Sequence, residues 1–447
     1  MKVVIVGTGE VGKHIARTLS MERHDVTLVE RDADRVRALE GELDVLLVEG
    51  NGASPKVLRD VGARHADLLL AVTQTDEVNV IAALAAHQLG TKRTVVRVRD
   101  PDFFGDDTDF NREVLGIDFV IDPEHAVADD IVDTMLLPGA VHVEHFADGR
   151  LALAETVLSV RSPLVGVVVE ERDTHRPHSI VAVVRRGEAL IPAAHERLEL
   201  GDHVLVVASR EDIRAVVDDI AGHADRIRDV VVFGGGKIGI HLASRLDSGD
   251  IACRIMERDP SRARWLAERL SHSLVLHEED LSKESLLEHG VDRAGAFVAC
   301  AGDDRTNLLA ALHAKQLGAG LCLAVVSREE FVPLVDALGI DGAFSLRLTT
   351  AEAILRFVRG HSVRAMHLLL SGSEALELAA EEGSPIAGSS IAAEGLLEAC
   401  EVGGILRDGR VIIPRAGDEE RIHAGDRVLL FRLEGRAREV ARAFDAP

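Results

Sequence analysis

Hydrophobic and polar positions follow one another in a regular order along the first 140 residues. Short runs rich in Val, Leu and Ile, typical of strands buried on both faces, are separated by amphipathic stretches with helical spacing. The runs lie at residues 3–6, 26–29, 45–48, 68–72 and 94–98. Because strands that alternate with helices form parallel sheets, this region predicts a doubly wound α/β domain.

The same pattern returns 227 positions later in the chain. The opening segment VVIVGTGEVGKHIARTL is repeated as VVVFGGGKIGIHLASRL, and the later segment VTQTDEVNVIAALAAHQLG matches CAGDDRTNLLAALHAKQLG. Three glycines of each copy correspond: Gly7, Gly9 and Gly12 in the first, and Gly234, Gly236 and Gly239 in the second. The chain is therefore predicted to be a tandem duplication.

A smaller pattern follows each α/β region. The segment RSPLVG matches GSPIAG, and LIPAAHERLELGDHVLVV matches IIPRAGDEERIHAGDRVLLF. Short β-like runs separated by Gly, Pro and Asp, with a helical stretch at residues 211–220, predict a small α+β domain. The predicted order is an α/β domain at 1–138, a small domain at 139–224, a second α/β domain at 225–362 and a second small domain at 363–447.

Two further helices are predicted where the α/β and small domains join, at residues 123–137 and 349–359. Apolar side chains lie on one face of each: Val127, Ile131 and Met135 on the first, and Ile354, Phe357 and Val358 on the second. Such a stripe predicts either a contact inside the chain or a contact between subunits.

The glycine motif predicts a nucleotide site of the Rossmann type. GTGEVG follows a strand and opens a helix, and an acidic residue, Glu30, ends the next strand. The glycines allow a tight turn, close approach of a pyrophosphate and close packing of helix on strand, so the phosphates would meet main-chain amides. The Glu30 carboxylate would accept hydrogen bonds from ribose hydroxyls and favour NAD(H) or an adenine nucleotide over NADP(H), an inference that the adjacent Arg31 weakens. The candidate amides and side chains here are those of Gly7, Thr8, Gly9, Glu10, Val11, Gly12, Glu30 and Arg31.

Further candidates lie at the carboxyl ends of the later strands, where ligands collect in doubly wound sheets. They are Asn51 and Gly52 after the third strand, Thr73, Gln74, Asp76 and Asn79 after the fourth, and Arg97 and Arg99 at the fifth. The alternation of Arg97 and Arg99 puts both on one face, where they would meet terminal phosphates. The alternative for this pair is a surface salt bridge.

The second half keeps the glycines and the acidic residue but departs elsewhere. Its candidates are Gly234, Gly236, Lys237, Ile238, Gly239, Glu257 and Arg258. Glu278, Glu279 and Asp280 replace the neutral loop of the first half, Ala301 replaces Thr73, and Val325 and Ser327 replace the two arginines. The added carboxylates and the missing cations both disfavour a polyphosphate. We expect a weaker or different ligand there, with a divalent cation at Glu278–Asp280 as one way to hold it.

The amino-acid composition limits the kinds of partner that the protein is expected to bind. The 447 residues carry 51 Lys and Arg against 75 Asp and Glu, a net charge of −24, which disfavours nucleic acid and anionic membrane surfaces. The N-terminus enters a strand pattern at once without a signal-peptide pattern, so a cytoplasmic protein is expected. Cys253, Cys300, Cys322 and Cys400 form no C-x-x-C pair and are expected to be buried. His142, His145, His175 and His178 have ligand-like spacing but do not recur in the second half, so exposed loop histidines and no metal site are predicted.

The two glycine motifs, the TQTDEVN and GDDRTN segments and the small module after each α/β region together resemble the TrkA family. These are cytosolic regulatory subunits of Trk-type potassium uptake systems, built from tandem RCK (regulator of K⁺ conductance) units. The resemblance covers essentially the whole chain. It implies two Rossmann domains, each with a small RCK C-terminal domain, and NAD(H), ATP or ADP as ligands.

The resemblance also implies a location and partners. They are a membrane-embedded potassium-translocating subunit similar to TrkH or TrkG, and further copies of the chain in a dimer or tetramer ring. The protein would be peripheral at the inner face of the plasma membrane, and its nucleotide would set the activity of the pore. The family's site positions fall on Gly7, Gly9, Gly12, Glu30, Asn51, Thr73, Asp76 and Arg97, and on Gly234, Gly236, Gly239 and Glu257.

Two alternatives remain open from the sequence. An NAD-dependent oxidoreductase uses the same glycine motif, but it needs a substrate domain with a general acid or base, and no such residue recurs in both halves. No catalytic residue is therefore assigned. An RCK-type regulator of another ion transporter is the second alternative.

Overall fold

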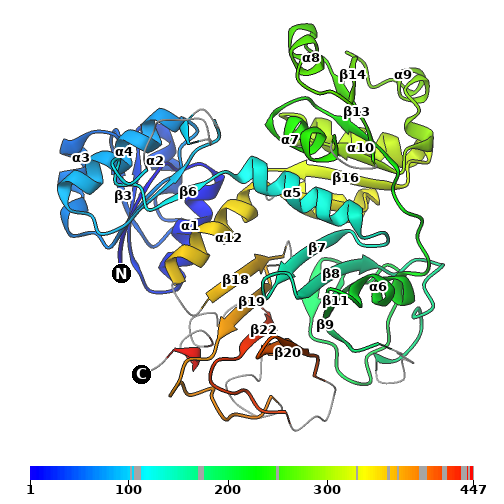
Figure 1. Ribbon diagram of the computed structural model, residues 1–447. Helices are drawn as coiled ribbons and strands as arrows, with labels where there is room; N and C mark the ends of the chain where they lie inside the picture. The colour runs from blue at the N-terminus through cyan, green and yellow to red at the C-terminus, as the bar shows by residue number, and fades with distance from the viewer. Residues whose placement is uncertain are drawn as a thin grey trace. The chain divides into compact units, whose positions relative to one another are not determined.

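The computed structural model describes residues 1–100, 103–104, 112–169, 176–247, 251–328, 331–359, 363–369, 372–391, 400–414, 420–433, 440 and 443–445. The chain forms two compact units (Figure 1). The first unit is Met1–Glu124 with Leu346–Val358, and the second is His125–Ser345 with Arg359–Pro447. No described helix combines the length and the apolar character that crossing a bilayer requires.

The first unit contains a six-stranded parallel sheet with the order β3-β2-β1-β4-β5-β6. The strands are β1 Lys2–Val6, β2 Asp25–Glu30, β3 Leu46–Glu49, β4 Leu68–Ala71, β5 Thr94–Arg97 and β6 Phe119–Ile121. Its helices are α1 Glu10–Met21, α2 Ala33–Leu39, α3 Pro55–Asp60 and α4 Asp76–Leu89, with a 3₁₀ turn η1 at Ala63–His65. The five predicted strands are all present. The sixth, β6, was not predicted because three residues are too short to show a period.

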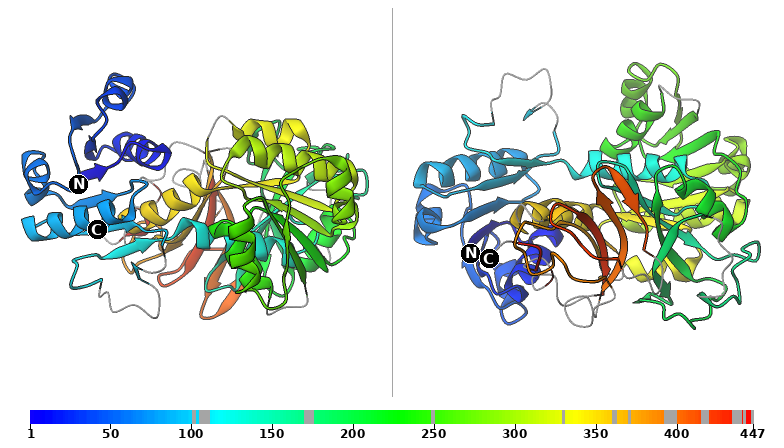
Figure 2. Two further views of the ribbon diagram at one scale, coloured as in Figure 1. Left: turned by 90° about the horizontal axis from the view of Figure 1, so that it is seen from above. Right: turned by 60° about the horizontal axis from the view of Figure 1, so that its bottom comes forward.

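The second unit repeats this sheet with the order β14-β13-β12-β15-β16-β17, in green to yellow in Figure 2. Its strands are β12 Asp229–Phe233, β13 Ala252–Glu257, β14 Leu274–His277, β15 Ala296–Ala299, β16 Leu321–Val326 and β17 Gly342–Ser345. Its helices are α7 Lys237–Leu246, α8 Pro260–Ala267, α9 Lys283–Glu288, η4 Val291–Arg293, α10 Asp304–Leu317 and α11 Val332–Leu338. The two strand orders match position by position, as a duplication requires. Both sheets are of the doubly wound type that the sequence predicts.

Two five-stranded antiparallel sheets form the small domains, both in the second unit. The first, β10-β9-β11-β8-β7, consists of β7 His142–Phe146, β8 Leu151–Val157, β9 His178–Arg185, β10 Glu188–Leu190 and β11 His203–Ser209, with helix α6 at Ile213–Ala221. The second, β18-β19-β22-β20-β21, consists of β18 Val363–Leu368, β19 Glu374–Ala379, β20 Cys400–Arg407, β21 Arg410–Ile412 and β22 Arg427–Arg432. The fold class predicted from the sequence, parallel-sheet domains that each have a small mixed domain, is confirmed.

The two small domains share one hydrophobic core. Phe146, Leu153 and Val207 of the first sheet belong to the same buried cluster as Leu429 and Phe431 of the second. A hydrogen bond from the Ala147 amide to the Glu377 carboxylate, 2.8 Å long, joins the sheets at the edge of this core.

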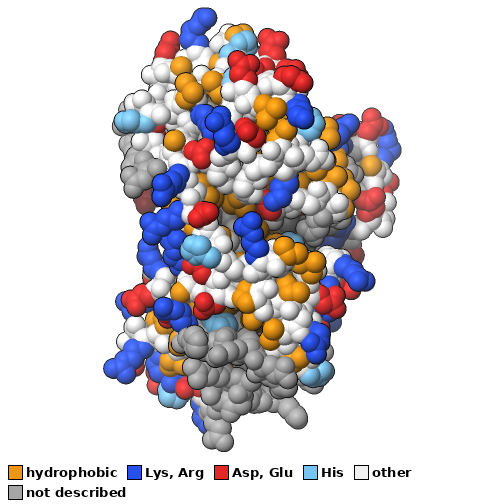
Figure 3. Space-filling view, turned by 90° about the vertical axis from the view of Figure 1, so that its right-hand side faces the viewer, with side chains coloured by type: hydrophobic (Ala, Val, Ile, Leu, Met, Phe, Trp, Pro, Cys, Tyr) orange, Lys and Arg blue, Asp and Glu red, His pale blue; other side chains and the backbone are white. Residues whose placement is uncertain are grey.

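On the face of the molecule drawn in Figure 3, basic side chains lie interspersed among acidic ones.

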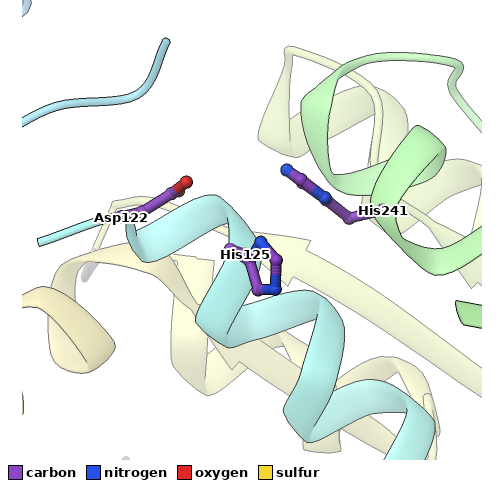
Figure 4. Close-up of side chains that lie close together, drawn as sticks. All are labelled: Asp122, His125 and His241. Atoms are coloured by element: carbon purple, nitrogen blue, oxygen red, sulfur yellow. The ribbon is translucent and has the colours of Figure 1, made fainter. Parts of the chain in front are cut away.

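Each of the two helices that join the domains packs in the compact unit that holds the Rossmann domain of the other half of the sequence. Helix α5 (Pro123–Leu136) packs in the second unit, where Asp129 pairs with Arg245 of α7 at 2.7 Å and the His125 ring lies 4.4 Å from the His241 ring (Figure 4). Its apolar stripe of Val127, Ile131 and Met135 is buried, so the prediction of a contact inside the chain is confirmed.

Helix α12 (Leu346–Arg359) packs in the first unit, and it begins three residues before the predicted start. Phe357 stacks on Phe119 with ring centroids 5.5 Å apart, and Arg347 lies 2.8 Å from a ring nitrogen of His14. Ile354 and Val358 are buried. Each joining helix therefore packs against the Rossmann domain of the other half of the sequence.

Candidate functional site

The glycine loop of the first Rossmann domain has the geometry that the motif predicts. Gly7 has a φ of +107°, a left-handed conformation that side chains disfavour. A Cβ atom on Gly12 would lie 2.0 Å from the Gly7 carbonyl oxygen, so only glycine allows this packing of α1 on β1. A Cβ atom on Gly9 would meet nothing within 4 Å, and Gly9 caps the N-terminus of α1. The loop therefore presents open space at the positive end of a helix dipole.

Glu30 at the end of β2 braces this loop. Its Oε2 accepts hydrogen bonds from the Thr8 amide at 3.1 Å and the Thr8 hydroxyl at 2.5 Å, and its Oε1 accepts one from the Asp32 amide at 3.0 Å. Burial alone would raise the pKa of Glu30, but these hydrogen bonds to the ionised form outweigh burial and hold that pKa below its ordinary value. Oε1 keeps a lone pair for a further donor.

Asn79 organises the carboxyl end of β4. The residue is fully buried, and its amide donates to the carbonyl oxygens of Thr73, at 3.1 Å, and Arg97, at 2.8 Å. Its Oδ1 accepts from the Thr73 amide and hydroxyl. Asn79 was predicted as a ligand contact, but its side chain is already engaged and has no open surface. It positions Thr73, which is only partly buried.

Arg97 and Arg99 both pair with carboxylates of their own unit. Arg97 lies 3.5 Å from Glu124, with 13% and 10% of the two side chains exposed. Burial lowers the pKa of Arg97, and burial raises the pKa of Glu124. Arg99 lies 3.7 Å from Asp76 and donates to the carbonyl oxygen of Gln74. Both arginines therefore form salt bridges, as in the alternative interpretation, but the Arg97 pair is largely buried rather than on the surface.

The remaining first-half candidates differ in exposure. Glu10, Arg31, Asn51 and Gln74 are exposed, and Val11 and Gly52 are buried. A Cβ atom on Gly52 would lie 2.1 Å from Val6, so this glycine is required by packing against β1. Only the main chain of Val11 and Gly52 can face a ligand.

The second Rossmann domain has the same frame as the first, that is, the same glycine-loop geometry and the same hydrogen bonds at the ends of its strands. Gly234 has a φ of +110°, and a Cβ atom on Gly239 would lie 2.0 Å from the Gly234 carbonyl oxygen. Gly236 caps α7, followed by Lys237, Ile238 and Gly239. Glu257 accepts from the amides of Gly235 and Asp259, as Glu30 does from Thr8 and Asp32, and the next residue, Arg258, is exposed.

Asn307 occupies the place of Asn79 in this frame. Its amide donates to the carbonyl oxygens of Ala301, at 3.0 Å, and Val325, at 2.8 Å. Ala301 has no hydroxyl to donate, and Asn307 Oδ1 has no hydrogen-bond partner among the described residues. The second domain thus keeps the hydrogen bonds that hold the strand ends together, but it lacks the side chains that would face a ligand in the first domain.

Side chains of the second domain also engage its own loop. Arg262 donates from Nε to the Gly235 carbonyl oxygen at 2.9 Å and lies over the Trp265 ring at 4.1 Å. Glu278 accepts from the Asp280 amide and lies 3.0 Å from His289, and these hydrogen bonds lower the pKa of Glu278 to about 2. Glu278–Asp280 are not among the described groups whose ligand atoms converge on a common point, so the structure lends no support to the cation predicted there.

The structure also corrects the sequence interpretation of the histidines. His142 and His145 lie on strand β7, and His178 begins β9 and is buried, so these residues are not exposed loop histidines. His175 lies outside the described residues. The predicted burial of cysteines holds for Cys253, Cys300 and Cys322, while Cys400 is only partly buried.

Comparisons with known proteins agree with this architecture. The TrkA-N domain family matches the chain twice, at residues 3–123 and 230–346. Trk system potassium uptake protein TrkA of Halomonas elongata is 35% identical to the chain and covers 99% of it, over 98% of its own length. The protein of the same name from Haemophilus influenzae is 32% identical and covers 96% of this chain and 95% of its own.

Two solved structures share the fold. The RCK domain of GsuK aligns with a TM-score of 0.62 at 20% identity, over 99% of this chain and 94% of that one. The GsuK channel bound to NAD aligns with a TM-score of 0.61, also at 20% identity, over 99% of this chain and 78% of that one. With a TrkA-N match in each half and such relatives along nearly its whole length, the chain belongs to the TrkA family of Trk system potassium uptake proteins.

Proposed function

We propose that the first Rossmann domain binds NAD(H) or an adenine nucleotide, ATP or ADP. Gly7, Gly9 and Gly12 shape a loop at a helix N-terminus for the phosphates, and Glu30 is ionised and placed to accept from a ribose hydroxyl. The GsuK channel, which shares the fold, has been solved with NAD. Asn51, Thr73 and the exposed Gln74 complete the proposed site from neighbouring strand ends.

The two arginines are proposed to distinguish nucleotides by phosphate number. Arg97 Nε and Arg99 Nε are buried and have no hydrogen-bond partner among the described residues. A terminal phosphate would supply acceptors that ADP lacks, and bidentate pairs of Arg with phosphate are among the strongest hydrogen bonds in proteins. ATP and ADP would then stabilise different arrangements of Arg97 and Glu124.

The second Rossmann domain is proposed to bind a different ligand or to bind weakly. Ala301, Val325 and Ser327 stand where Thr73, Arg97 and Arg99 stand in the first. The Arg262 side chain also donates a hydrogen bond to the carbonyl oxygen of Gly235 in the glycine loop. This difference between two copies built on the same frame is the observation that carries the proposal.

The chain is proposed to act as a regulatory subunit of potassium uptake rather than as an enzyme. Its relatives are named as potassium uptake proteins, and its fold is that of the RCK domain of a channel. The proposed partner is a membrane-embedded potassium-translocating subunit of the TrkH or TrkG type, contacted by a homo-oligomeric ring at the inner face of the membrane. A ligand would regulate such a partner only if it bound two ring arrangements with different affinity.

A matched pair of variants tests the site. Gly9 and Gly236 both cap a helix, have φ of −65° and −69°, and would place a Cβ atom in open space. Gly9→Val should therefore fold like Gly236→Val but obstruct the approach of a pyrophosphate. In calorimetric titrations with NADH, ATP and ADP we expect Gly9→Val to lose at least tenfold in affinity and Gly236→Val to keep the affinity of the unmodified chain. Equal losses in both would contradict the assignment.

Regulation needs separate experiments. Co-purification from detergent extracts should recover a multi-span potassium-translocating protein, whereas recovery of a different transporter would favour the alternative RCK regulator. Steady oxidation of NADH with an added small substrate would support the oxidoreductase alternative instead.

A further inference from the structure

A cluster of two histidines and a carboxylate lies in the second compact unit, in the small domains rather than at either glycine loop. His142 and Glu144 come from β7 of the first small domain, and His367 comes from β18 of the second. Each residue offers one nitrogen or oxygen atom that lies within 4.8 Å of the other two. Residues about 220 positions apart in sequence therefore converge where the two small domains meet.

The geometry of the cluster is close and nearly parallel. The His142 and His367 rings are stacked with centroids 4.3 Å apart and an interplanar angle of 18°. Glu144 Oε2 lies 3.8 Å from His367 Nδ1. The Phe344 ring lies 5.4 Å from the His142 ring, so the cluster also has an apolar neighbour.

His142 contributes a buried ring nitrogen to the cluster. Its Nε2 is buried and has no hydrogen-bond partner among the described residues. A buried polar nitrogen without a partner carries a desolvation cost that a bound ligand would remove.

We propose that His142, Glu144 and His367 form a metal site for a divalent transition cation, with Zn²⁺ the ion that the donors fit best. Two imidazole nitrogens and one carboxylate oxygen suit Zn²⁺, whereas Mg²⁺ and Ca²⁺ prefer oxygen ligands alone. Ligands about 2.0–2.2 Å from a tetrahedral zinc lie roughly 3.3 Å from one another. Because a metal lies in the plane of each imidazole that binds it, the two stacked rings must rotate out of their parallel arrangement to share one ion. A water molecule would complete the four ligands.

Such an ion would have a mechanical consequence. Because β7 and β18 belong to different small domains, the metal would cross-link two sheets that otherwise share a core and polar contacts at its edge. Binding to the folded chain alone would raise its stability by mass action. The site is independent of the nucleotide proposal and needs no ligand at either glycine loop.

The test measures Zn²⁺ binding by the full chain, purified without a tag that binds metals and stripped with a chelator. We expect one Zn²⁺ per chain in competition with a chromophoric chelator, and a higher thermal midpoint with Zn²⁺ but not with Mg²⁺. Co²⁺ should give the visible absorption of a four-coordinate site. His142→Gln and His367→Gln should each weaken Zn²⁺ binding at least tenfold.

The matched control is His145→Gln. His145 lies on the same strand, with 39% of its side chain exposed, but is not a member of the cluster. It should leave the affinity unchanged. Absence of binding to the unmodified chain, or equal binding by His142→Gln and the unmodified chain, would overturn the proposal. If the histidine variants fail to fold, Glu144→Gln, which replaces a partly exposed residue, must still lower the affinity.

Discussion

Asn79 donates a hydrogen bond to the carbonyl oxygen of Arg97, 2.8 Å away, and so ties the loop after β4 to the end of β5. The corresponding bond from Asn307 to Val325 has the same length in the second Rossmann domain. The frame of the site is therefore independent of the arginine side chain, which only the first domain carries. This separation lets the frame and the ligand contacts be tested one at a time.

The first prediction concerns this frame. Asn79→Ala removes several buried hydrogen bonds and should lower the free energy of unfolding by about 2–4 kcal/mol. Affinity for the nucleotide should fall with it, because Thr73 loses its anchor. Denaturant unfolding and calorimetry measure the two effects. Asn307→Ala is the control: it should destabilise the second domain and leave nucleotide affinity unchanged.

The second prediction concerns Arg97. Arg97→Met should reduce ATP affinity by roughly 10–100-fold, the loss of a charge-assisted pair, and ADP affinity by much less. Lys92→Met serves as the control, because Lys92 precedes β5 at the opposite end of the strand and is 73% exposed. Equal effects of Arg97→Met on ATP and ADP would show that Arg97 does not contact a terminal phosphate.

The third prediction concerns Glu30 and pH. The folded-state pKa of Glu30 is below its ordinary value of 4.5, so the ionised carboxylate stabilises the fold above that value. This contribution should be lost as the pH falls through the lowered pKa. The stability difference between the unmodified chain and Glu30→Gln should therefore be largest near pH 6–7 and shrink in acid. Unfolding measured at several pH values tests this, with Glu49→Gln to account for removing an exposed carboxylate. A difference that grows in acid would contradict the assignment.

The fourth prediction concerns the contact between the small domains. Glu377 is buried, accepts from the Ala147 amide and pairs with Arg427. Glu377→Ala leaves the buried Ala147 amide without its acceptor and Arg427 with only the exposed Asp148, and it should cost about 3 kcal/mol of stability. Asp148 also pairs with Arg427 but is 80% exposed, so Asp148→Ala should change the thermal midpoint little. A larger effect from Asp148 would show that the exposed pair holds the domains together.

Much of the fold follows from local patterns in the sequence. Five strands of the first Rossmann sheet follow from short runs of apolar residues, and the second sheet follows from the matching segments of the repeat. Gly7 and Gly12 are predictable because their roles depend on main-chain geometry within a few residues. The strand β7 was missed because its sequence, HVEHF, places polar residues at three of five positions.

The tertiary structure decided the relations between distant segments. An apolar stripe shows that a helix face is buried but not what covers it, so the sequence did not predict that α5 and α12 exchange Rossmann domains. Nor could it predict that Arg97 pairs with Glu124, or that His142 stacks on His367. Local periodicity records only whether a position is buried. Which side chains meet depends on chain closure over tens to hundreds of residues, and that is settled only when the whole core packs.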